Sequence, residues 1–165
     1  MVYNIIPDGG KKMNQTITLK PIGHVVSPVE ETVDEKWGCV LSRVVLLPEY
    51  AGGLDGLDGF SHVIIVTYLN KAKYEPAMHL KRRPRGLESM PLVGIFSQRA
   101  KDRPNPIGVT AVRVVRVGTD HLEVQGLDAI NGTPVLDIKP YYPPYDKIEN
   151  PQTPEWVAEL MKDYF

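Results

Sequence analysis

Residues 94–117, GIFSQRAKDRPNPIGVTAVRVVRV, join a stiff, cationic loop to a long apolar run. The loop places cations at alternate positions: Arg99, Lys101 and Arg103. Pro104 and Pro106 flank Asn105. Because proline fixes its own φ and biases the preceding residue toward extended conformations, this part of the loop is stiff before any tertiary contact forms. Such a loop between two strands suits an anionic or electron-rich ligand, although a proline-rich turn on a solvated surface explains the same residues equally well.

Short apolar runs separated by turn residues recur along the chain, which is typical of β structure. The run FSHVIIVTYL, residues 60–69, is almost continuously β-branched and aromatic. Residues 118–120 form a turn between antiparallel strands, and Asn131-Gly132 is the strongest hairpin signal in the chain. The expected strands are residues 22–26, 40–47, 60–69, 92–96, 109–117, 121–124 with a continuation at 127–129, and 135–140.

A helical spacing of apolar residues appears near the C-terminus, where it predicts a short helix over about residues 154–164. Thr153 is its expected cap and Pro154 its first residue. A doubly wound α/β fold needs helices between its strands, which this sequence does not supply. Sheets of this size avoid open edges by closing. The sequence therefore predicts an all-β fold: a small closed, mostly antiparallel β-barrel of six to seven strands with a short C-terminal helix.

The length of 165 residues indicates one domain, residues 16–165, after a flexible leader, residues 1–15. The formal net charge of −1 excludes a bulk nucleic-acid binder, so affinity for nucleic acid requires a local basic patch. The single cysteine, Cys39, excludes an internal disulfide and a cysteine-rich zinc site, and fits a reducing compartment. No apolar run approaches ~20 residues, so neither a transmembrane helix nor a signal peptide is expected.

Residues 71–90 predict a long, mobile, basic loop, because Pro76, Pro84 and Gly86 interrupt any helix. Its cations are Lys73, Lys81, Arg82, Arg83 and Arg85. They indicate either a solvated loop or an arm that contacts phosphates. Trp37, beside Gly38 after an acidic segment, leaves a similar choice: its ring folds back on the core or offers a stacking face.

Familiar catalytic signatures are missing, among them the P-loop, GxGxxG, HExxH and GxSxG. Cys39 and His62 are a conceivable nucleophile pair, but Cys39 opens an apolar strand and fits the core better. Asp128 and Asp137 are conceivable paired acids, although each also has a structural role available at a turn or a strand end. Two loops dense in motifs remain, residues 99–108 and 127–145.

The blocks GIFSQRAKDRPNPIG, residues 94–108, and LDAINGTPVLDIKPYYP, residues 127–143, resemble the two hallmark blocks of the tRNA adenosine-37 N6-methyltransferase family. Its members are S-adenosylmethionine enzymes built on a TsaA-like β-barrel. PIG at 21–23 and GFSH at 59–62 extend the resemblance, which covers about residues 20–146. It implies methylation of N6 of threonylcarbamoyladenosine at tRNA position 37, by a cytoplasmic homodimer that binds its cofactor near the subunit interface and uses neither a metal nor a membrane.

The resemblance also implies which residues contact the cofactor. Carried over by position, they are Trp37, Gly38, Asn70, Lys71, Arg99, Val109, Asp137, Ile138, Lys139 and Pro140. The chain departs from the family at Trp37-Gly38, where its segment is short and acidic. Arg99 suits the methionine carboxylate, and Asp137 suits a ribose hydroxyl or the ammonium group.

Methyl transfer from a sulfonium to an amine is an in-line displacement, and alignment alone can supply roughly 7–11 kcal/mol. We expect Asn105, held by two prolines, to accept a hydrogen bond from the N6 amine and orient its lone pair, and this hypothesis comes from the residues alone. The residues expected to contact the tRNA anticodon loop are Lys81, Arg82, Arg83, Arg85, Lys101, Arg103, Tyr141 and Tyr142. For the tyrosines, packing of a proline-rich strand end is the alternative.

Two other functions remain open at this point. One is a β-barrel module that binds S-adenosylmethionine or RNA without chemistry. The other is a methyltransferase of the same fold that acts on another nucleotide or on a small molecule.

Overall fold

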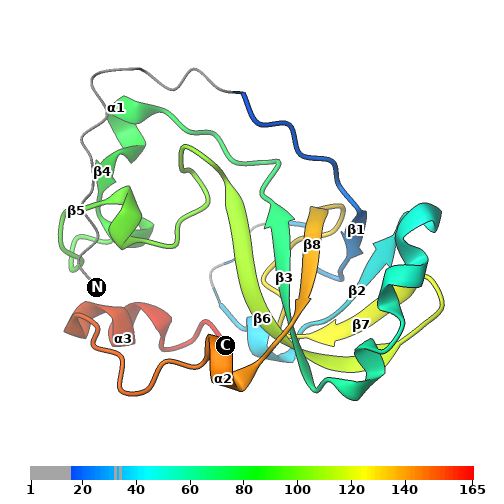
Figure 1. The fold of residues 1–165 in the computed structure, drawn as a ribbon. Helices are drawn as coiled ribbons and strands as arrows, with labels where there is room; N and C mark the ends of the chain where they lie inside the picture. Colours follow the sequence, from blue (N-terminus) through cyan, green and yellow to red (C-terminus); the bar gives the residue numbers. More distant parts are fainter. Residues whose placement is uncertain (1–15, 32, 34) are drawn as a thin grey trace, which may run out of the picture.

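The computed structural model describes residues 16–31, 33 and 35–165 of the chain. Its body is a closed barrel in the order β1-β2-β7-β6-β3-β8, in which every neighbouring pair is antiparallel (Figure 1). The strands are β1 (Gly23–Val26), β2 (Leu41–Leu46), β3 (His62–Tyr68), β6 (Ile107–Val117), β7 (His121–Gln125) and β8 (Pro134–Pro140). The prediction of a closed, all-β barrel is confirmed.

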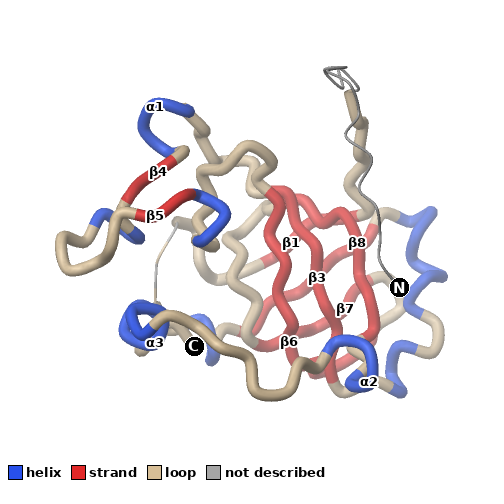
Figure 2. The backbone as a smooth tube through the Cα atoms, turned by 60° about the vertical axis from the view of Figure 1, so that its left-hand side comes forward, coloured by secondary structure: helices blue, strands red, loops and turns tan. Residues whose placement is uncertain are grey.

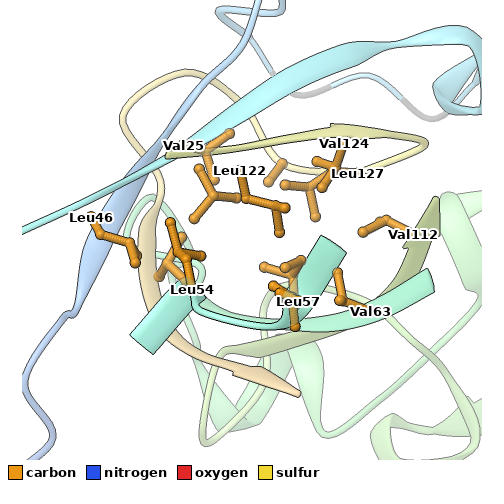
Figure 3. Packing of buried hydrophobic residues seen from close by; sticks show 13 residues of the cluster. Val25, Leu46, Leu54, Leu57, Val63, Val112, Leu122, Val124 and Leu127 are labelled. Carbon is orange, nitrogen blue, oxygen red and sulfur yellow. The ribbon is translucent and has the colours of Figure 1, made fainter. Parts of the chain in front are cut away.

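The barrel interior is filled by the residues of each strand that alternate inward, as the period of two in a strand requires. On β3, for example, Val63 and Ile65 are fully buried. Leu54 and Leu57 join the same cluster from two 3-10 helices, η2 (Pro48–Leu54) and η3 (Leu57–Gly59), as Figure 3 shows. The apolar interior therefore accounts for the one core expected of a chain of this length.

A bulge in β6 explains why Arg113 and Arg116, three residues apart, are both exposed. The register against β7 shifts between Val114 and Arg116, so that Val115 is an extra residue in the ladder. Such an insertion moves every later side chain to the other face of the strand. Both arginines consequently point outward, although a regular strand would have buried one of them.

The prediction of a barrel strand at residues 92–96 was wrong. Only β5 (Val93–Gly94) is extended there, and it pairs with β4 (Lys81–Arg82) in a separate two-stranded sheet, while η5 (Ile95–Ser97) is a 3-10 helix. The basic segment also contains α1 (Pro76–His79) and η4 (Pro84–Gly86), so it has more local structure than a loop. Figure 2 shows this small unit to one side of the barrel.

The expected continuation of a strand at residues 127–129 was also wrong, because β7 ends at Gln125 and Gly126 adopts a positive φ of 89°. The Asn131-Gly132 turn exists but does not join two paired strands. Its Asn131 Oδ1 accepts from the Ser27 amide at 3.3 Å, and the Gly132 amide donates to the Val25 carbonyl at 2.8 Å. The turn therefore ties β1 to the start of β8.

The C-terminal helix is present as α3 (Glu155–Met161), preceded by the short α2 (Pro143–Asp146). Its cap position is Pro154, with no side-chain hydrogen bond, so the capping role expected of Thr153 was wrong. The tail beyond α3 pairs with an early segment, since the Lys36 and Trp37 amides donate to the Asp163 and Tyr164 carbonyls, both at 2.8 Å. The leader predicted at residues 1–15 lies outside the described residues. In the part of the chain that the structure describes, none of the helices has the length and apolarity that a membrane crossing requires.

Candidate functional site

A groove of about 670 Å³ on the outside of the barrel brings five of the predicted site residues together: Arg99, Arg103, Asn105, Val109 and Tyr141. Its other lining residues are Ile64, Phe96, Gln98, Ile107, Ala111 and Asp146. The groove thus joins the outer face of β3 and β6 to the proline-rich loop and to the start of the segment after β8. Its volume lies within the roughly 300–1,000 Å³ typical of small-molecule sites.

The floor of the groove is apolar because outward residues of β3 and β6 stand opposite one another. Val66 pairs with Val109, and Ile64 pairs with Ala111. Val109 is 46% exposed and Ile107 is 38% exposed, although both belong to the longest strand of the barrel. Phe96, at 79% exposed, adds an aromatic face that the sequence analysis had assigned to a strand. An apolar floor of this kind suits the flat face of an adenine ring.

The wall of the groove is the proline-rich loop, which hydrogen bonds hold in place. The Leu69 amide donates to the Pro106 carbonyl and the Ile107 amide to the Asn105 carbonyl, both at 2.8 Å. Arg99 donates through its guanidinium to the Val109 carbonyl, and Arg103 to the Gln98 carbonyl at 3.4 Å. These hydrogen bonds hold the two arginines beside the floor, where Asn105 also lines the groove.

The strand β8 places Asp137 and Lys139 next to the groove on the same outer face, opposite Val66 and Ile64 of β3. The Lys139 ammonium lies 2.6 Å from Asp137 Oδ2. This hydrogen bond, together with the charge of the carboxylate, raises the pKa of Lys139. Ile138 points the other way and packs against the barrel interior, so any ligand contact from it comes from its backbone.

The other residues expected to contact the cofactor lie outside the groove. Asn70 and Lys71 follow β3 after one intervening residue, Leu69, and the Lys71 ammonium donates to the Glu30 carbonyl at 3.4 Å. Trp37 is only 3% exposed, and its indole donates to the Val33 carbonyl at 3.1 Å. Its ring therefore folds back on the protein, which is one of the two alternatives that the sequence left open, and offers no open stacking face. Gly38 lies against the Phe165 backbone, where a Cβ would come within 2.8 Å.

The cations expected to contact RNA lie on the β4–β5 unit and on the loop, and most have protein partners. Arg83 donates to the Met90 carbonyl, and the Arg85 guanidinium lies 5.5 Å from the centre of the Tyr164 ring. Lys101 and Arg82 both approach Asp102. Several cations of the segment predicted as a mobile loop therefore have protein contacts, and their contact with phosphates stays a prediction.

The two tyrosines expected to contact RNA both pack on aromatic rings of the protein, and Tyr141 also lines the groove. Tyr142 packs on Phe60 with ring centres 5.8 Å apart, and Tyr141 meets the His62 ring at 6.5 Å while lining the groove. The packing alternative is therefore confirmed for both rings, and RNA contact by Tyr141 stays a prediction.

Sequence reasoning missed Phe96, Gln98 and Asp102, which the structure places at or beside the groove. Asp102 carries a signal in the sequence, because it is an acidic residue among alternating cations, and Gln98 is a polar residue directly before the first of them. Phe96 carried none, because an aromatic residue after an apolar run looks like part of a strand. Among residues 16–31, 33 and 35–165, no group of three or more His, Cys, Asp or Glu side chains is placed to hold a metal ion.

Comparison with known proteins places this chain in a family. The model of the tRNA-methyltransferase O N-terminal domain matches residues 33–147. A probable S-adenosyl-L-methionine-binding protein of Methanothermobacter thermautotrophicus is 38% identical over 136 residues, which are 80% of this chain and 95% of that protein. The human tRNA (adenine(37)-N6)-methyltransferase is 37% identical over 117 residues, which are 70% of this chain and 25% of that protein.

A solved structure resembles this protein along most of the chain. The crystal structure of TrmO from Pseudomonas aeruginosa superimposes with a TM-score of 0.71 at 30% identity. The superposition covers 87% of this chain and 63% of that one. The chain therefore spans a little under two thirds of the length of the solved relative.

Proposed function

Since this chain belongs to the tRNA-methyltransferase O N-terminal domain family, we propose that it uses S-adenosylmethionine to methylate N6 of threonylcarbamoyladenosine at position 37 of tRNA. The observation that supports this most is the groove, which collects Arg99, Asn105 and Val109 on one apolar floor. Relatives named as S-adenosylmethionine-binding proteins and as a tRNA (adenine(37)-N6)-methyltransferase support the cofactor and the substrate.

The residues around the groove fit the cofactor chemically. Arg99 offers a fork of donors for the methionine carboxylate, and the floor at Val109 offers apolar area for the adenine. Asp137 suits a ribose hydroxyl or the ammonium group of the cofactor. To bind either, its carboxylate must keep only one oxygen on the Lys139 ammonium or break that ion pair. When bound, S-adenosylmethionine would supply a methyl group on a sulfonium; transfer to the N6 nitrogen would break the sulfur–methyl bond, release S-adenosylhomocysteine and pass the N6 proton to solvent.

Asn105 would act on the substrate side of the reaction. Its side chain is exposed in the groove, and its backbone is set by the two flanking prolines. In the part of the chain that is described, no hydrogen bond occupies its amide. The amide oxygen is thus available to accept the N6–H and hold the nitrogen in line, while the apolar floor excludes water.

Position 37 lies in the anticodon loop, so the enzyme must hold a single-stranded segment of RNA. We propose that Lys81, Arg82, Lys101 and the neighbouring arginines contact its phosphates, and that Tyr141 stacks on a base. We also propose a cytoplasmic homodimer in which a second copy packs on the exposed outer face at Ile107, beside the part of the floor at Val109 that the adenine would occupy.

The function is tested with purified protein, labelled S-adenosylmethionine and tRNA from a strain that lacks the gene. We expect label in the RNA, and we expect mass spectrometry of the nucleosides to identify N6-methylated threonylcarbamoyladenosine. Label in another nucleoside would assign the protein to a different substrate.

A binding module without chemistry is the second candidate, because relatives such as the Methanothermobacter protein are named only for binding the cofactor. The same incubation separates the two. Tight binding of the cofactor with no transfer to any tRNA would favour the module and contradict the enzyme.

A further inference from the structure

Asp102 has no role in the function proposed above, yet it lies where the basic segment and the proline-rich loop meet. Its side chain is only 12% exposed. One oxygen, Oδ1, accepts from the Lys73 amide at 2.9 Å. The other, Oδ2, lies 3.0 Å from the Lys101 ammonium and 3.8 Å from the Arg82 guanidinium. A single carboxylate therefore contacts three points on two segments of the chain.

Two cations so close together repel each other unless an anion lies between them. Lys101 belongs to the loop and Arg82 to β4, and both approach the same carboxylate oxygen. Burial alone would raise the pKa of Asp102, but the hydrogen bonds from Lys73 and Lys101 and the nearby positive charges outweigh it, so the pKa is lowered. The carboxylate is thus ionised near neutral pH, when both cations are charged as well.

The same two segments are joined by neutral hydrogen bonds, which set their distance. The Gln98 side-chain amide donates to the Arg82 carbonyl at 2.9 Å and to the Val93 carbonyl at 3.1 Å. The Ile95 amide donates to the Leu80 carbonyl at 3.0 Å. These bonds hold the backbones together, but they do not bring the charged groups of Lys101 and Arg82 to one place. That task falls to Asp102.

We propose that Asp102 is a positioning residue for RNA binding: it holds Lys101 and Arg82 side by side so that both meet the same stretch of tRNA backbone. The inference rests on the proposed function, in which these cations contact phosphates. Removing an acidic residue from a basic surface would, by charge alone, strengthen binding to RNA. Positioning predicts the opposite sign, so the two explanations can be told apart.

The test compares Asp102→Asn, which keeps the shape of the side chain, with Glu88→Gln. Glu88 is exposed within the same basic segment, so its substitution removes the same charge without disturbing the junction. We expect Asp102→Asn to weaken tRNA binding about tenfold, as the loss of charged hydrogen bonds allows. We expect Glu88→Gln to bind as well as wild type or more tightly.

Three further readouts separate positioning from a general loss of structure. The slope of log Kd against log salt should fall by about one in Asp102→Asn, as if one phosphate contact were lost. The KM for tRNA should rise, while kcat at saturating tRNA and the affinity for S-adenosylmethionine stay unchanged. Hydrogen exchange at the Lys73 amide should stay close to wild type in Asp102→Asn, because the substituted side chain keeps an oxygen that can accept from this amide, and this would show that the backbone junction is intact.

Equal or tighter tRNA binding by Asp102→Asn, with an unchanged salt slope, overturns the inference. That outcome differs from a failure of the proposed function, in which wild-type protein neither binds nor methylates tRNA. If Asp102→Asn lowers cofactor affinity and the melting temperature along with tRNA affinity, Asp102 only stabilises the fold, and the inference is again overturned.

Discussion

Asn105 is the residue on which the chemical part of the proposal depends. Replacing it with Ala removes the amide oxygen but leaves both flanking prolines, so the loop should keep its shape. We expect kcat to fall on the order of 100-fold, because misplacement of the reacting nitrogen is costly in an in-line transfer. Single-turnover methylation with saturating cofactor measures this.

A matched substitution tests whether acceptance of a hydrogen bond is the reason. Asn105→Asp keeps an acceptor oxygen in the same place, so it should retain more turnover than Asn105→Ala. Calorimetry should give all three proteins the same affinity for S-adenosylmethionine. Full turnover by Asn105→Ala with cofactor binding intact would remove Asn105 from the mechanism.

At the level of elements, the contact between the C-terminal tail and the barrel is the least expected feature. The Tyr164 hydroxyl donates to Asp128 Oδ2 at 2.9 Å, and the hydroxyl of Thr110, a buried residue of β6, donates to the other oxygen of the same carboxylate. Asp128 thus ties the tail after α3 to β6. Of the two roles considered for Asp128, the structural one therefore fits. A carboxylate that accepts hydrogen bonds from two structural donors is not available to act with Asp137 as a pair of catalytic acids.

Loss of this hydrogen bond should destabilise the protein. We expect Tyr164→Phe to lower the free energy of unfolding by about 1 kcal/mol, the usual net value of one hydrogen bond. For a chain of this length that corresponds to about 2–4 °C in Tm, measured by calorimetry. Tyr145→Phe is the control, since Tyr145 is 87% exposed and should melt with wild type. Identical melting of the two variants would mean that the hydrogen bond between Tyr164 and Asp128 does not contribute to stability.

The strands show what could be read from the chain and why. The six barrel strands are long enough for alternating or continuous apolar residues to stand out, and each was found to within about two residues. The errors fell on short or irregular segments. β5 has only two residues, and its partner β4 lies in the basic segment, which the sequence predicted to be a loop. A two-residue ladder has no period, so its existence depends on a distant partner that a local pattern cannot reveal.

For the whole molecule, the open question is how the apolar outer face of β3 and β6 is covered. We expect light scattering to give about twice the 18.5 kDa mass of the chain. Ile107→Lys, on that face, should shift the protein toward a monomer, because a charge in an apolar interface is costly. Leu41→Lys is the matched control, since Leu41 is also exposed but lies on β2, which the strand order puts across the barrel from β3.

Comparing Ile107→Lys with Leu41→Lys shows whether the dimer depends on this particular face. A wild-type monomer, or a dimer that both substitutions leave intact, would contradict the proposal that this face lies between subunits. A dimer lost equally in both variants would point to a general effect on folding, which the melting temperatures would show.

The amino-acid sequence alone was sufficient for the barrel and for the loop at residues 99–106, because alternation, turn residues and paired prolines act over a few neighbouring positions. It also identified Arg99, Asn105 and Val109, which the groove then brought together. Folding in three dimensions was needed to pair Asp102 with the Lys73 amide across 29 positions and Tyr164 with Asp128 across 36. Such contacts join single side chains from separate elements, and no local pattern encodes them, because they form only when the closed barrel has brought those elements together.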